Sequence, residues 1–118
     1  METITELFTR YPSLAECENV LHDALALWKQ TYDSGCKFLL CGNGGSAADS
    51  EHIVGELMKG FLLKRPMTDA DKAAFLKLYP DDGYVTDHLQ RAIPAIALVS
   101  HTALSTAWCN DAPPELCY

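Results

Sequence analysis

The stretch KFLLCGNGGSAADSEHIVGELMKGF, residues 37–61, decides how this chain folds. It begins with a short apolar run near glycines on both sides, which is typical of a buried strand in a parallel sheet. The turn GNGGS, residues 42–46, breaks this run and is called the glycine turn below. Small and apolar residues then recur at helical spacing up to Met58, with Ser46 as the expected N-cap and Asp49 in the capping-box position. The stretch predicts a strand, a tight turn and a helix.

A long helix is expected before this stretch. Apolar residues recur at helical spacing between Ser13 and Gly35. Ser13 and Glu16 form a capping-box pattern at the start, and Gly35 is placed to end the helix in a left-handed conformation. The sequence therefore predicts one N-terminal helix over this segment.

A second apolar run, PAIALVS at residues 94–100, predicts another buried strand, and a helix is expected over residues 102–111. Residues 64–92 differ from these strand and helix segments, and we interpret them as a helical insertion. Within it, Thr68 with Asp71 is expected to cap a short helix, and a turn and another short helix follow.

Strands that alternate with helices favour a parallel sheet with crossover connections. We therefore predict an α/β fold of the three-layer α/β/α, Rossmann-like type, in a single domain over residues 1–118. Only two strands are visible in the sequence, and both would lie at a sheet edge. The fold is therefore expected to be incomplete within this chain and to need an oligomer.

Composition narrows the classes of partner. The net charge of -7 disfavours nucleic acid and anionic membranes, because both bind clustered Lys and Arg. Five cysteines with no Cys-x-x-Cys pair indicate reduced thiols, and the first residues lack the apolar core of a signal peptide. We expect a cytoplasmic protein.

The glycine turn follows a strand, and ligands of open α/β sheets bind at the carboxyl ends of the strands. Glycine lets the backbone approach a ligand, and the next helix N-terminus favours an anion. We expect phosphate binding by four consecutive residues, Asn43, Gly44, Gly45 and Ser46. The turn lacks the Gly-Lys-Ser/Thr and Gly-x-Gly-x-x-Gly patterns, so no nucleotide cofactor is expected. The alternative is a tight connection without a ligand.

His52 and Glu56 are four residues apart and share one helical face. This pair could hold a divalent metal, or could move a proton between adjacent carbons of a sugar. The alternative interpretation is a solvated helix surface. Glu51 and Asp49 are expected to be surface or capping residues.

The stretch CGNGGSAADSEHIVGELMKGF resembles the N-terminal half of the sugar isomerase (SIS) domain of sedoheptulose 7-phosphate isomerases, also called phosphoheptose isomerases. The resemblance continues through AIALVSHTALSTAWCND and leaves out the segment 64–92. It implies a five-stranded parallel sheet in a homotetramer with active sites at subunit contacts. Asn43 and Ser46 match positions that contact the sugar phosphate.

The same resemblance implies chemistry for the helical pair. Glu56 matches the glutamate that acts as acid or base in an aldose–ketose interconversion through an enediol, here of sedoheptulose 7-phosphate and a heptose 7-phosphate. His52 with Glu56 also matches half of a zinc (Zn²⁺) site of some members, so both are candidates for catalysis and for metal binding.

The sequence departs from the family in three places. The family's second phosphate loop, second catalytic histidine and remaining metal ligands have no counterpart within residues 1–118. His101 stands where many members carry aspartate, and Cys109 where many carry glycine. The alternatives to an isomerase are therefore a non-catalytic SIS module, which binds a sugar phosphate or a protein partner, and an inactive fragment.

Overall fold

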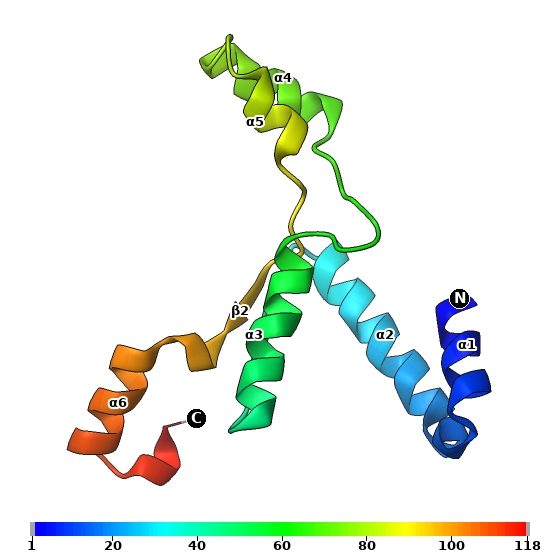
Figure 1. The fold of residues 1–118 in the computed structure, drawn as a ribbon, viewed down its shortest axis with the longest axis vertical. Helices are drawn as coiled ribbons and strands as arrows, with labels where there is room; N and C mark the ends of the chain where they lie inside the picture. The colour runs from blue at the N-terminus through cyan, green and yellow to red at the C-terminus, as the bar shows by residue number, and fades with distance from the viewer. Residues whose placement is uncertain (1, 118) are drawn as a thin grey trace. The chain divides into compact units, whose positions relative to one another are not determined.

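The computed structural model describes residues 2–117. Its contacts divide the chain into two compact units, residues 1–36 and residues 37–118. Figure 1 shows the course of the chain, coloured from blue near the N-terminus to red near the C-terminus. The prediction of a single domain over the whole chain stays a prediction. Within residues 2–117, none of the helices has the length and apolar character needed to cross a membrane.

The first unit is helical. It consists of α1 (Glu2–Arg10), the 3₁₀ helix η1 (Pro12–Cys17) and α2 (Glu18–Asp33). The predicted helix start at Ser13 is wrong, because Pro12 occupies the first turn of η1 and places Ser13 inside a helical turn. No side chain caps η1 or the start of α2.

Gly35 ends α2 as predicted. Its φ of 68° is left-handed. The Gly35 amide donates to the Tyr32 carbonyl and the Cys36 amide donates to the Thr31 carbonyl, each over 3.0 Å. This is the Schellman arrangement, which satisfies carbonyls that the end of a helix leaves open.

The second unit contains the sheet. Strand β1 (Phe38–Leu40) pairs in parallel with β2 (Ala95–Ala97), with Leu39 opposite Ile96. Helix α3 (Gly45–Met58) connects toward the insertion and packs on both strands. After β2 the chain continues through η2 (Leu98–Ser100), α6 (Thr102–Asp111) and η3 (Pro114–Leu116). The two predicted strands and their parallel pairing are confirmed, but the second strand is shorter than the run 94–100 because Leu98–Ser100 form η2. The chain is compatible with an incomplete α/β fold. Three layers and five strands stay a prediction.

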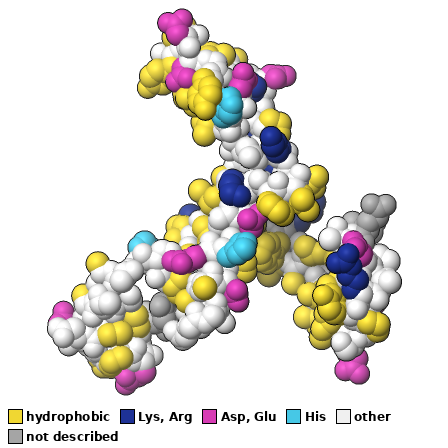
Figure 2. Space-filling view, in the orientation of Figure 1, with side chains coloured by type: hydrophobic (Ala, Val, Ile, Leu, Met, Phe, Trp, Pro, Cys, Tyr) yellow, Lys and Arg dark blue, Asp and Glu magenta, His cyan; other side chains and the backbone are white. Residues whose placement is uncertain are grey.

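Few side chains of the described residues are buried. Among residues 2–117 the buried apolar side chains are Ala95 and Ala97, and the buried polar ones are Ser50 and Thr86. The expectation that β1 is a buried strand is wrong at its centre, because Leu39 is 60% exposed. A sheet of two strands leaves each strand with one unpaired edge. Figure 2 shows hydrophobic side chains on much of the visible surface.

The insertion forms two helices, α4 (Asp69–Leu78) and α5 (Gly83–His88). The Thr68 hydroxyl caps α4 by accepting from the Asp71 amide over 3.1 Å, as predicted. Lys72 joins the two helices by donating to Asp87 over 2.9 Å. The hydrogen bond and charge of Lys72 hold the pKa of the Asp87 carboxyl below its usual value.

The base of the insertion is attached to the C-terminal end of α3. The Gln90 side-chain oxygen accepts from the amides of Gly60 and Arg65, over 3.1 and 3.2 Å. The Arg65 guanidinium donates to the Leu57 carbonyl over 2.7 Å and to the Arg91 carbonyl over 2.9 Å. A cation there also suits the negative end of the helix dipole. The insertion therefore leaves the fold at the end of α3 opposite to the glycine turn.

We expect the protein to self-associate, because unpaired strand edges and exposed apolar residues such as Leu39 are stabilised by a second chain. Size-exclusion chromatography with light scattering at micromolar concentration should give a mass of at least two chains. A compact monomer that melts cooperatively would contradict this expectation.

Candidate functional site

The turn from β1 into α3 needs glycine at two positions. A Cβ on Gly42 would lie 2.6 Å from the Ser46 Cβ and 2.7 Å from the Ser46 carbonyl oxygen, which is closer than real contacts allow. Gly44 has a φ of 57°, in the left-handed region. These two glycines let the strand pass into the helix within five residues.

Helix α3 begins earlier than expected. Gly44 is its N-cap, and no side chain caps the helix. The prediction of Ser46 as N-cap is wrong, because the left-handed Gly44 already starts the turn and the Ser46 amide donates back to the Asn43 carbonyl over 3.1 Å. Ser46 therefore lies in the first turn of α3, where its hydroxyl does not cap the helix.

The four residues predicted to bind phosphate lie together at this helix N-terminus. The side chains of Asn43 and Ser46 are exposed. The Ser46 and Ala47 amides donate within the turn, whereas the amides of Gly44 and Gly45 donate no hydrogen bond within residues 2–117. Two open amides, an amide side chain and a hydroxyl are donors suited to an anion at the positive end of a helix.

His52 and Glu56 lie further along the same helix. The His52 Nε2 is 3.7 Å from the Glu56 Oε1, and Lys59 Nζ is 3.8 Å from the same oxygen. The His52 side chain is 77% exposed and that of Glu56 39%. Residues 45, 52 and 56 repeat at spacings of seven and four, so the pair continues the helix face that begins at Gly45.

The chemistry of this pair follows from its geometry. An imidazole and a carboxylate in near contact can pass protons to and from a substrate. As a metal site the pair supplies two ligands, whereas zinc takes three or four from protein. Within residues 2–117 no group of three or more His, Cys, Asp or Glu side chains could hold a metal ion.

The end of β2 supplies further polar groups. The Ser100 hydroxyl donates to the Glu51 Oε1 over 2.9 Å and so links η2 to α3. His101 stands at the N-cap of α6, and its side chain makes no capping bond. Its carbonyl accepts from the Ser105 amide over 3.0 Å. Sequence reasoning placed Glu51 on the surface and missed the bond to Ser100.

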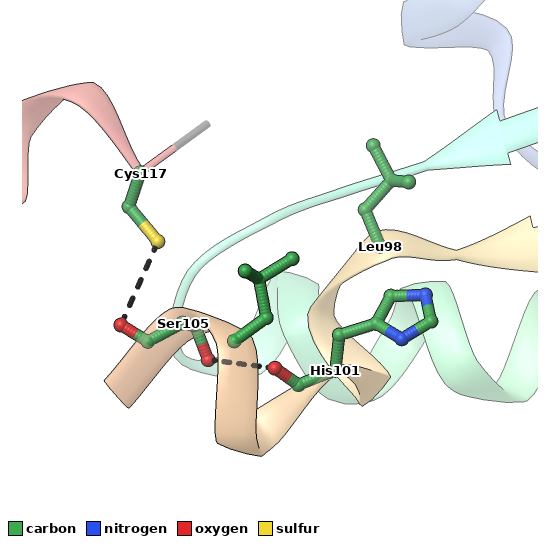
Figure 3. A pocket seen from close by; sticks show the side chains of 5 residues that line it. Leu98, His101, Ser105 and Cys117 are labelled. Carbon is green, nitrogen blue, oxygen red and sulfur yellow. Dashed lines mark hydrogen bonds between the residues drawn. The ribbon is translucent and has the colours of Figure 1, made fainter. Parts of the chain in front are cut away.

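A cavity of about 170 Å³ lies beside the end of β2, between α6 and the C-terminal segment. Its lining is mostly apolar and consists of Leu98, His101, Leu104, Ser105 and Cys117. Figure 3 shows the Cys117 thiol directed toward Ser105 and the His101 imidazole turned away from that thiol. Burial and neighbouring Cys109 raise the pKa of the Cys117 thiol. This cavity includes none of the predicted site residues.

The substitution Gly42→Ala should destabilise the second unit and displace Ser46, because the new Cβ overlaps the first turn of α3. We expect a loss of about 1–3 kcal/mol in the free energy of unfolding, measured with urea. Gly45→Ala is the matched control, because within residues 2–117 no atom outside its chain neighbours and its own helix backbone lies within 4 Å of its Cβ position. Equal stability of the two variants would contradict the close approach.

Comparisons with known proteins identify relatives. The chain is 33% identical over 91 residues to "Phosphoheptose isomerase" of Crocosphaera subtropica, covering 77% of this chain and 34% of that protein. Identity to the protein of the same name from Clostridium acetobutylicum is 39% over 82 residues, which covers 70% of this chain and 29% of that protein. The chain is 34% identical over 100 residues to the protein of the same name from Geotalea daltonii, which covers 85% of this chain and 35% of that protein.

No family model matches the chain, and no solved structure matches it. The chain spans about a third of the length of the curated relatives it matches. The similarity agrees with the resemblance that the glycine turn and the His52–Glu56 pair indicate. The sequence is therefore related to those of the phosphoheptose isomerase family.

Proposed function

We propose that this chain is part of a sugar-phosphate isomerase that interconverts sedoheptulose 7-phosphate and D-glycero-D-manno-heptose 7-phosphate. Its relatives are phosphoheptose isomerases by name. The observation that supports the proposal is that one helix carries both sets of candidate groups. The anion-binding donors lie at the start of α3, and the His52–Glu56 pair follows on the face that starts at Gly45.

The spacing along α3 suits a long sugar phosphate. His52 and Glu56 lie seven and eleven residues after Gly45, which corresponds to about 10 and 16 Å of helix at about 1.5 Å per residue. Helical side chains lean back toward the N-terminus, which shortens these separations. A seven-carbon chain has six carbon–carbon bonds of about 1.5 Å each, and because these zigzag at tetrahedral angles its extended span from C1 to C7 is about 7.5 Å, with the phosphate ester beyond it. A phosphate at the glycine turn thus leaves the far carbons near the pair.

In this mechanism Glu56 acts as the base. Its carboxylate removes a proton from C1 of the ketose while the C2 carbonyl oxygen gains a proton, which forms the enediol. His52, beside Glu56, exchanges protons with the two substrate oxygens. Loss of the proton on O1 and return of a proton from Glu56 to C2 then give the aldose. No proton or electron is gained overall.

Because the side chains of His52 and Glu56 are exposed to solvent, we propose that a second chain covers them. Proton transfer to carbon is favoured where water is excluded, and His52 is 77% exposed in a single chain. We propose that another copy, in a homotetramer, covers this face of α3 and completes the site. A zinc ion held by His52 and Glu56 would take its remaining ligands from outside residues 2–117.

The second candidate is a non-catalytic module that binds a sugar phosphate at the glycine turn. The exposure of His52 favours this candidate, because the anion-binding donors are assembled within one chain whereas the proton-transfer pair is not enclosed. An inactive fragment is the remaining alternative to the isomerase. The two candidates differ in what removal of Glu56 would change.

Ser46→Ala should weaken binding of sedoheptulose 7-phosphate about tenfold, because it removes a donor to a charged phosphate. Glu56→Gln should bind nearly as wild type and lose turnover, because only the proton acceptor is removed. Phosphorus NMR reports both, through the shift of the substrate resonance and the growth of a product resonance. Ser13→Ala, an exposed serine in the first unit, is the control.

Equal loss of binding in the Ser46 and Glu56 variants would contradict their separate roles. Binding without turnover in the wild type would reject the isomerase and favour the non-catalytic module. A circular dichroism spectrum of each variant shows whether the helices have been kept.

A further inference from the structure

Two connections leave the sheet at the same edge. Leu40 and Ala97 are paired at the ends of the parallel strands. Asn43 follows Leu40 by three residues, and Ser100 follows Ala97 by three residues. Ligands of open α/β sheets bind outside the carboxyl ends of the strands. Ser100 therefore stands at the binding edge beside the glycine turn.

Helix α3 places a carboxylate at this edge. Ser50 is 4% exposed and points toward the packed side of α3, and Glu51 is the next residue along the helix. Glu51 lies about 100° around the helix from both Ser50 and His52, at the border between the buried and the open face. The bond from Ser100 fixes it there, over 2.9 Å.

Only one of the two oxygens of the Glu51 carboxylate accepts a hydrogen bond within residues 2–117. Its Oε1 accepts from Ser100, and within residues 2–117 its Oε2 has no hydrogen-bond partner. A carboxylate only accepts hydrogen bonds, so its open oxygen can take a hydroxyl proton. The same charge repels a phosphate, so it suits the sugar and not the phosphate group.

We propose that Glu51, oriented by Ser100, binds a hydroxyl group of the sugar phosphate and so selects a polyhydroxylated phosphate over free phosphate. This inference rests on the proposed function and names a further binding residue for it. Glu51 lies six residues after Gly45, about 9 Å along α3, which is within the span of a sugar whose phosphate occupies the glycine turn. Ser100 is a positioning residue that acts through Glu51.

The test compares two ligands, sedoheptulose 7-phosphate and inorganic phosphate, by isothermal titration calorimetry of the whole protein. Glu51→Gln should lose about tenfold in affinity for the sugar phosphate, the value of one hydrogen bond to a charged acceptor. Its affinity for inorganic phosphate should not fall. Glu16→Gln, which removes an exposed carboxylate from η1, is the matched control and should change neither affinity.

A double-mutant cycle tests the role of Ser100. Ser100→Ala alone should weaken sugar-phosphate binding, and should cause no further loss in the Glu51→Gln background, because its effect passes through Glu51. Additive losses would overturn the positioning role. A merely structural bond would lower both affinities together, or neither.

If the wild type binds the sugar phosphate more tightly than phosphate and Glu51→Gln is unchanged, the inference about Glu51 is wrong and the proposed function stands. If the wild type binds neither ligand, the proposed function is wrong and the inference falls with it.

Discussion

The close approach of Gly42 to Ser46 is the constraint on which the arrangement of this chain depends. Any Cβ at Gly42 would meet both the side chain and the backbone of Ser46. Together with the left-handed Gly44, this contact turns the chain from β1 directly into α3. The turn therefore fixes where α3 begins, which amides remain open, and how far along the helix His52 and Glu56 lie. The open amides of the glycine turn and the His52–Glu56 pair lie on one helix because of it.

The same geometry explains why the site is open. The side of α3 that carries Ser50 packs on the strands, and the side that carries His52 faces outward. A sheet of two short strands cannot cover the remaining surface, and Leu39 stays exposed at its centre. A single chain thus holds the donors that we propose bind phosphate, whereas the chemistry that we propose for Glu56 would depend on an added surface. The insertion, attached through Gln90 and Arg65, leaves from the opposite end of α3.

The sequence predicted those structural features that depend on residues close together in the chain. The positions of the two strands, the Gly35 helix end and the Thr68 cap depend on residues within a few positions, and the structure confirms them. The burial of the strands depends on distant parts of the fold, and Leu39 is exposed against expectation. The predicted starts at Ser13 and Ser46 were wrong, because Pro12 and Gly44 impose backbone conformations that compete with side-chain capping. The link between Glu51 and Ser100 joins residues 49 positions apart, and it depends on how α3 packs on β2. No spacing within either segment could have shown it.

The most direct test of the account is solvent exchange at the substrate carbons. Protein incubated with sedoheptulose 7-phosphate in heavy water, and followed by proton NMR, should place deuterium on C1 of the ketose, because a base at Glu56 exchanges the abstracted proton with solvent. Glu56→Gln should abolish this labelling. Substrate that binds, as judged by phosphorus NMR, and yet gains no deuterium would contradict the claim that this helix bears a proton-transfer site.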